Sequence, residues 1–90
     1  MSIETLTSKY ITSAEHVLRT MVKLQGPITV GTEKIELLVE YVRAYLEDAK
    51  YYKDQKRLET SLTSIAYCEG LLEALRLIGA VKFDWPVNQK

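Results

Sequence analysis

The sequence is poor in the side chains that bind metals or carry redox chemistry. Its 90 residues contain one cysteine, Cys68, and one histidine, His16. A single cysteine excludes a disulfide within the chain, and the two residues together cannot supply the four ligands of a structural zinc site. Cys68 falls on the core-facing side of a helical pattern, where a free cysteine acts as a small apolar residue. The sequence therefore predicts no metal site, no cofactor and no catalytic residue.

The chain also lacks an excess of charge and a long apolar run. Twelve Lys and Arg residues balance twelve Asp and Glu residues, so no overall field draws the chain toward nucleic acid or an anionic membrane. No apolar run approaches the ~18 residues of a membrane span, and residues 1–10 have no apolar centre of the signal-peptide kind. These absences favour a cytoplasmic protein that does not bind a membrane.

Helical periodicity is what the sequence does contain, and it is clearest in residues 34–53. There Leu38, Val42 and Tyr45 follow one another at steps of four and three, which places them on one side of an α-helix. Charged residues hold the opposite side, so this segment has a core face and a solvent face. Similar apolar patterns precede and follow it. Three helices are predicted, over about residues 2–24, 33–53 and 58–78.

The helix ends are marked with unequal clarity. Gly26 and Pro27 are expected to end the first helix, Thr32 to cap the second, and Gly79 to close the third. A capping box formed by Thr12 with Glu15 allows a start of the first helix as late as Ser13.

The second and third helices are separated only by a change of apolar phase at residues 54–57, which contain neither glycine nor proline. A turn at this point restores the match of apolar faces. The alternative is one helix of about 45 residues, which would be ~68 Å long at 1.5 Å per residue and stable only in an oligomer.

Short connections between helices make neighbours antiparallel. We therefore predict an all-α fold, a three-helix up-and-down antiparallel bundle over residues 1–80, with an extended C-terminal tail over residues 81–90. The same alignment places Tyr10 near Glu47 and Leu6 near Tyr51.

The third helix and the tail carry more large apolar groups than three helices of this length need for their own core. A large exposed apolar patch marks an interface. We predict a homodimer or another protein partner, although the alternative is a tail that folds back on its own bundle. The predicted interface consists of Leu71, Leu77, Ile78, Val81, Phe83 and Trp85.

One end of the predicted bundle gathers basic and aromatic residues, a combination that binds phosphates and stacks bases. Nearby carboxylates almost cancel the charge, and tyrosines at helical spacing also occur as core edges with their hydroxyls in water. A nucleotide- or RNA-binding accessory module is therefore the alternative function. Its candidate patch consists of Lys9, Tyr10, Lys50, Tyr51, Lys53, Lys56 and Arg57.

The sequence gives no support for acid–base catalysis. In the antiparallel alignment of the second and third helices, Asp48 lies two helical turns from Glu69, so no tight cluster of carboxylates is expected. We expect the protein not to be an enzyme.

Residues 45–52 (YLEDAKYY) and 66–75 (AYCEGLLEAL), together with Lys9, Tyr10 and Ile11, resemble domain-of-unknown-function family 357, a small archaeal family. The resemblance implies a three-helix up-and-down bundle with no established activity, and an accessory role, since some relatives carry this domain beside a nucleotidyltransferase-like domain. The turn between the second and third helices lacks the glycine usual in the family. Together, residues and resemblance favour a non-catalytic interaction or scaffolding module that self-associates.

Overall fold

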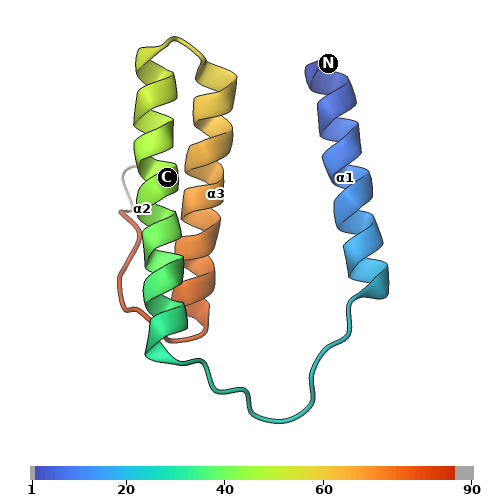
Figure 1. Cartoon of the computed structure of the whole chain (residues 1–90), viewed down its shortest axis with the longest axis vertical. Coiled ribbons are helices and arrows are strands. Elements are labelled where there is room, and N and C mark those ends of the chain that lie inside the picture. Colours follow the sequence, from blue (N-terminus) through green and yellow to red (C-terminus); the bar gives the residue numbers. More distant parts are fainter. Residues whose placement is uncertain (1, 87–90) are drawn as a thin grey trace.

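A computed structural model describes residues 2–86 of the chain as three helices in up-and-down order (Figure 1). They are α1 (Ile3–Thr20), α2 (Thr32–Asp54) and α3 (Leu58–Leu77). No strand occurs within the described residues. The all-α, three-helix prediction is confirmed, and the single long rod over residues 34–78 is excluded because the chain reverses at residues 55–57. The part of the predicted tail at residues 87–90 lies outside the described residues.

The core lies between α2 and α3, which form an antiparallel hairpin. Its buried members are Val42 of α2 and Cys68 and Leu75 of α3, and Leu75 is the most deeply buried, at 1% exposed. Two side chains of α3 also donate to backbone oxygens of α2: Ser61 Oγ lies 2.7 Å from the Ala49 oxygen, and Cys68 Sγ lies 3.5 Å from the Val42 oxygen. The partly buried residues around this core are Ile35, Leu38, Val39, Tyr45, Ile65, Leu71, Leu72, Ala80 and Val81.

The turn that reverses the chain places a lysine in a left-handed conformation. Lys56 has φ of 62° and is the one non-glycine residue with positive φ in the described chain. The Arg57 amide donates to the Tyr52 oxygen at 2.9 Å and the Lys56 amide to the Lys53 oxygen at 3.0 Å, which is the hydrogen-bond pattern of a Schellman motif. A residue with a Cβ atom is strained in this region by about 1–2 kcal/mol.

The other end of α3 uses the same motif with the expected residue. Gly79 has φ of 78°, and the Ala80 amide donates to the Leu75 oxygen at 3.0 Å. Gly79 thus closes α3 as predicted. The chain then reverses so that Ala80 and Val81 pack against the hairpin core.

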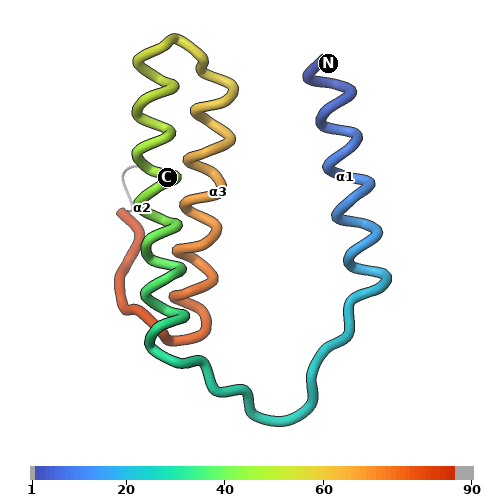
Figure 2. The backbone as a smooth tube through the Cα atoms, viewed as in Figure 1, coloured from blue at the N-terminus to red at the C-terminus, as the bar shows by residue number. Residues whose placement is uncertain are grey.

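Helix α1 does not pack against the hairpin. No Cα atom of α1 lies within 8 Å of a Cα atom of α2 or α3, and Figure 2 shows its backbone running separately beside them. Packed helices have axes 8–10 Å apart, so this backbone is too distant for side chains to interdigitate. The expected proximity of Tyr10 to Glu47 and of Leu6 to Tyr51 is therefore wrong.

Helix α1 is also shorter than predicted. It starts after Ser2, whose Oγ accepts from the Thr5 amide at 3.0 Å, and it ends at Thr20 rather than near residue 24. The next residue, Met21, has an extended backbone with ψ of 151°. Gly26 has the expected positive φ of 75°, but it lies in the linker and not at the helix end. Residues 21–24 have no packing partner, so continuing the helix through them would bury no apolar surface and would add little stability.

Helix α2 begins one residue earlier than predicted. Gly31 rather than Thr32 is its N-cap, and the Gly31 oxygen accepts from the amides of Lys34 and Ile35. Thr32 is the first residue of the helix.

The strain at Lys56 leads to a stability prediction. We expect Lys56→Gly to raise the free energy of unfolding by about 1 kcal/mol, because glycine adopts positive φ at no steric cost. Urea unfolding followed by circular dichroism measures the change. Lys56→Ala is the matched control, since it removes the same charge but keeps a Cβ atom. If alanine stabilised the protein as much as glycine, the charge rather than the backbone would be responsible.

Candidate functional site

The residues predicted as an interface do not form one open surface. Leu71 and Val81 are half-buried against the hairpin core, and Phe83 and Trp85 are half-buried as well, whereas Leu77 and Ile78 are 70% and 62% exposed. Along residues 81–86 the side chains alternate between half-buried and exposed, as in an extended strand lying on a surface. Thus the tail folds back on its own hairpin, the alternative that the sequence left open.

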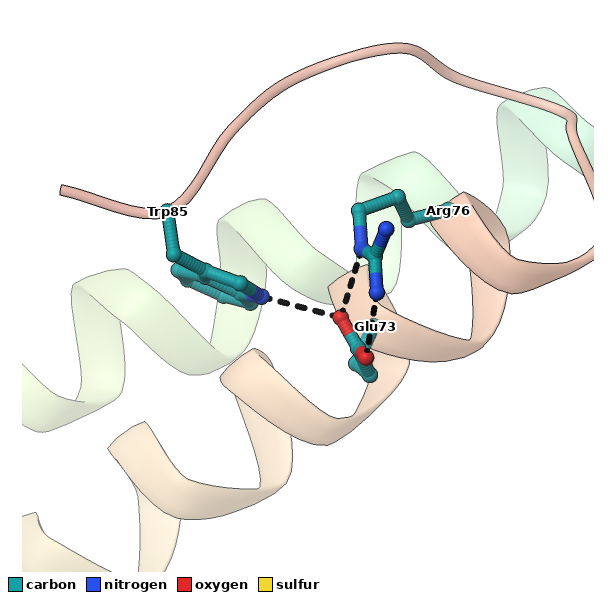
Figure 3. Close-up of polar contacts among 3 residues, drawn as sticks. All are labelled: Glu73, Arg76 and Trp85. Atoms are coloured by element: carbon teal, nitrogen blue, oxygen red, sulfur yellow. Dashed lines mark hydrogen bonds and ion pairs between the residues drawn. The ribbon is translucent and has the colours of Figure 1, made fainter. Parts of the chain in front are cut away.

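A three-residue contact holds the end of this tail (Figure 3). The indole nitrogen of Trp85 donates to Glu73 Oε1 at 2.9 Å, and the Arg76 guanidinium bonds both oxygens of the same carboxylate at 2.8 Å. The rings of Phe83 and Trp85 meet edge to face, with centroids 4.9 Å apart. We call Glu73, Arg76 and Trp85 the tail clasp.

The clasp shifts the ionisation of its members. Hydrogen bonds from Arg76, and then from Trp85, lower the pKa of Glu73 from 4.5 to about 2. The same contact with Glu73, with a smaller contribution from Asp84, raises the pKa of Arg76. Because the folded pKa of Glu73 is lower than its ordinary value, the clasp stabilises the tail fully above about pH 4.5, and this stabilisation is lost as the pH falls toward 2.

The opposite side of α3 carries aromatic residues that the tail does not cover. The rings of Tyr45 on α2 and Tyr67 on α3 have centroids 4.4 Å apart, and they bridge the two helices. Helical spacing adds Leu38 and Tyr41 to this side of α2, and Leu71 and Ile78 to this side of α3. Glu73 follows Leu71 by two residues, about 200° around the helix at 3.6 residues per turn, so the clasp lies on the other side.

We call this aromatic surface the tyrosine face. Tyr41 and Tyr67 are 44% and 52% exposed on it. The periodicity assigned Tyr45 to the core face of its helix, and in the structure it is half-buried against the hairpin core. The tyrosine face consists of Leu38, Tyr41, Tyr45, Tyr67, Leu71 and Ile78, of which Leu38, Tyr45 and Leu71 are half-buried against the hairpin core and the other three are exposed.

Helix α1 presents a second uncovered apolar surface. Its apolar residues recur at steps of three and four along one side, and none of its residues is buried. Glu4, Lys9, Glu15 and Arg19 lie off this line, as in a helix that normally packs on a partner. The stripe consists of Ile3, Leu6, Tyr10, Ala14 and Val17.

The predicted anion patch is only partly assembled. Lys50 to Arg57 lie together at the tip of the hairpin, where Arg57 sits 4.8 Å above the centre of the Tyr52 ring and Lys50 pairs with Glu47 at 3.4 Å. Lys9 and Tyr10 belong to α1, whose backbone does not approach the hairpin. Of the seven residues in the patch, the hairpin tip gathers Lys50, Tyr51, Lys53, Lys56 and Arg57.

Chemically reactive groups are few in the described chain. The Cys68 thiol is buried, and burial, followed by the charge of Glu69, raises its pKa, so the reactive thiolate form is disfavoured. His16 is exposed on α1. Between residues 2 and 86, no three His, Cys, Asp or Glu side chains lie close enough together to hold a metal ion. In the same part of the chain, no helix has the length and apolar character needed to cross a bilayer.

Together these features describe a small all-α protein whose distinctive surfaces are apolar and aromatic. The sequence model of the family described as Protein of unknown function (DUF357) matches residues 9–81, and the chain belongs to this family. No curated protein and no solved structure matches it significantly. The match covers most of α1, all of the hairpin and the start of the tail.

The tail clasp gives a pH prediction that Trp85, the single tryptophan, can report. In the wild type we expect its fluorescence to move to the solvent-exposed value as the pH falls from about 4.5 toward 2, when Glu73 takes up a proton. Glu73→Gln removes the titrating group and should abolish this transition. Glu40→Gln, which removes an exposed partner of Arg43 on α2, is the control and should keep the wild-type profile. Equal profiles in the wild type and Glu73→Gln would contradict the assignment.

Proposed function

We propose that the protein is a non-catalytic interaction module that acts by self-association, as a homodimer. The observation that carries this proposal is that most of the large apolar side chains of this short chain are exposed to solvent. Only four hydrophobic residues of the described chain are buried, Val42, Ala49, Cys68 and Leu75. An isolated helix of 18 residues, the length of α1, is marginal in water unless it packs an apolar face.

The chain has two separate apolar surfaces, and these support association more strongly than scattered exposed apolar residues would. The stripe of α1 and the tyrosine face each contain several contiguous large apolar groups, and tyrosine is among the residues enriched at the centres of protein interfaces. Single exposed apolar residues need no explanation, but contiguous ones mark contact sites. The charged residues on the outer sides of the helices would keep such a dimer in solution.

The predicted interface is revised by the position of the tail. The tail already packs on its own hairpin through Val81, Phe83 and Trp85. These side chains therefore stabilise the single chain and are not proposed as the centre of a dimer contact. Ile78 remains a candidate because it is exposed and lies on the tyrosine face. Its neighbour Leu77 is equally apolar and 70% exposed, but points to another side of α3.

Light scattering at increasing concentration tests the proposal. The chain of 10.3 kDa should give twice that mass. Ile78→Lys should raise the dimer dissociation constant by at least about tenfold, roughly 1.4 kcal/mol, because it places a charge within a desolvated contact. Leu77→Lys is the matched control and should leave the mass unchanged. A wild type that stays at the monomer mass at every concentration would refute self-association.

A second candidate, nucleotide or RNA binding at the hairpin tip, is favoured by the stacking of Arg57 on Tyr52. No salt bridge involves Lys53, Lys56 or Arg57 within residues 2–86. Against this, Lys53 lies in the last turn of α2, where a cation also stabilises the helix dipole.

Amide chemical shifts test the second candidate. On titration with ATP and with a short single-stranded RNA at low salt, binding predicts saturable shifts confined to residues 50–57, which Arg57→Gln should weaken. Arg43→Gln, on the exposed side of α2, is the control. Shifts that are absent at low salt would exclude this function.

A further inference from the structure

We propose that α1 is a lid that closes over the tyrosine face of its own chain, and that this closure competes with self-association. The competition rests on the proposed function, whereas the closure itself takes place within one chain. Its basis is that the stripe of α1 borders the side of its own α3 that carries Tyr67, although no Cα atom of α1 lies within 8 Å of the hairpin. The structure thus shows the lid open.

A groove of about 290 Å³ lies between α1 and the first part of α3. Thr63 and Ser64 on its α3 side precede Tyr67 by four and three residues, so they lie on the same side of the helix as Tyr67. Leu6 on its α1 side is the one residue of α1 that is half-buried. The groove is lined by Ile3, Leu6, Thr7 and Tyr10 of α1 and by Glu59, Thr60, Thr63 and Ser64 of α3.

The two helices run in the same direction and have similar lengths. Figure 1 shows the N-terminal end of α1 level with the turn that leads into α3. At 1.5 Å per residue, α1 with 18 residues is about 27 Å long, and α3 with 20 residues is about 30 Å long. Because both helices rise equally, a closed lid with Ile3 beside Thr60 has Tyr10 beside Tyr67 and Val17 beside Ala74.

The polar wall of the groove does not prevent closure. The Thr63 hydroxyl already donates to the Glu59 backbone oxygen of its own helix at 2.9 Å, and closure leaves this bond in place. Serine and threonine in helices bond in this way to the oxygen four residues earlier. Glu59 lies nine residues before the buried Cys68, about 180° around the helix. Its carboxylate is thus at the edge of the contact and stays in water.

Beyond the groove, α3 leaves room for the second half of α1. Gly70 is exposed in the middle of α3, and a Cβ atom added there would meet nothing within 4 Å. Glycine weakens a helix interior but lets another backbone approach closely. Ala74, one turn further on, is also small and exposed. These two residues form a low wall against which the C-terminal half of the stripe can pack.

The linker supplies the hinge. Ile28 and Val30 border a hollow at the base of the hairpin, so the end of the linker stays with the hairpin. The free part is residues 21–27, which include Gly26 with φ of 75° and reach about 25 Å at most when extended. A tether of this length holds α1 at a roughly millimolar local concentration. In more dilute protein, α1 therefore meets its own hairpin far more often than that of another chain.

Closure would remove both surfaces that support self-association. The stripe of α1 and the exposed ring of Tyr67 would cover each other within one chain. Only the open form then offers the tyrosine face to a second copy. Since the apparent dissociation constant equals the intrinsic one divided by the open fraction, closure weakens the dimer.

A designed disulfide tests the closure. Val17→Cys and Ala74→Cys are introduced into a chain that carries Cys68→Ala. A disulfide requires Cα atoms within about 7 Å, so it cannot form in the open structure. In dilute, mildly oxidised protein we expect a monomer without free thiols. Arg19→Cys with Ala74→Cys is the matched control and should keep its thiols, because Arg19 lies on the polar side of α1.

The outcomes separate the lid from the proposed function. Equal oxidation of the two pairs, oxidation of neither, or a disulfide only between chains would overturn the closure, provided that circular dichroism shows the reduced variants to be folded. By light scattering, the oxidised Val17→Cys/Ala74→Cys chain should dimerise at least about tenfold more weakly than its reduced form. Equal affinities would overturn the competition. If the wild type is a monomer at every concentration, self-association fails, whereas the disulfide still decides the closure.

Discussion

The packing of α2 against α3 is the interaction on which the rest of the structure depends. Leu75 and Cys68 fill the seam opposite Val42, and Ala49 is small enough for the Ser61 hydroxyl to reach its backbone oxygen. These contacts fix the register of the hairpin as well as its stability, since a shift of either helix would separate Ser61 from Ala49 and Cys68 from Val42. Both the tail clasp and the tyrosine face depend on this register, because each is assembled from residues that the seam positions.

Much of the hairpin follows from local sequence rules. The steps of three and four in residues 34–53 and 58–78 predict both helices, and the change of phase at residues 54–57 locates the turn although no glycine marks it. The structure explains how the turn forms without one: Lys56 adopts the left-handed conformation itself, and the hydrogen bonds of Arg57 and Lys56 to the end of α2 hold it there. Gly79 does the same at the end of α3 without strain. Turns that end a helix in this way involve only residues close together in the sequence, which is why sequence patterns predict them.

The location of α1 and of the tail could not be predicted in the same way. An apolar stripe indicates that a helix has a partner, but not which surface in which molecule provides it. The stripe over Ile3 to Val17 was therefore assigned to a closed bundle, whereas the helix runs apart from the hairpin. The tail posed the same problem, and it is resolved by a contact with no short-range signal: Trp85 reaches Glu73, twelve residues away, only because Gly79 turns the chain back along α3. The anion patch was divided for the same reason, since Lys9 and Tyr10 follow α1 and not the hairpin tip.

The tail and the tyrosine face divide the hairpin into two sides with different roles. On one side, Val81, Phe83 and Trp85 cover α3, and the ion pair beneath Trp85 holds the tail above the pH at which Glu73 is protonated. That side is already occupied by the chain's own residues. On the other side, the paired rings of Tyr45 and Tyr67 span the seam but leave Tyr41 and Ile78 accessible. A helical hairpin has two broad sides, so once the tail covers one of them, a third helix can add only to the other. The stripe of α1 has the length and spacing for that place. In the structure the N-terminal half of that stripe borders a groove whose other wall is the first part of α3.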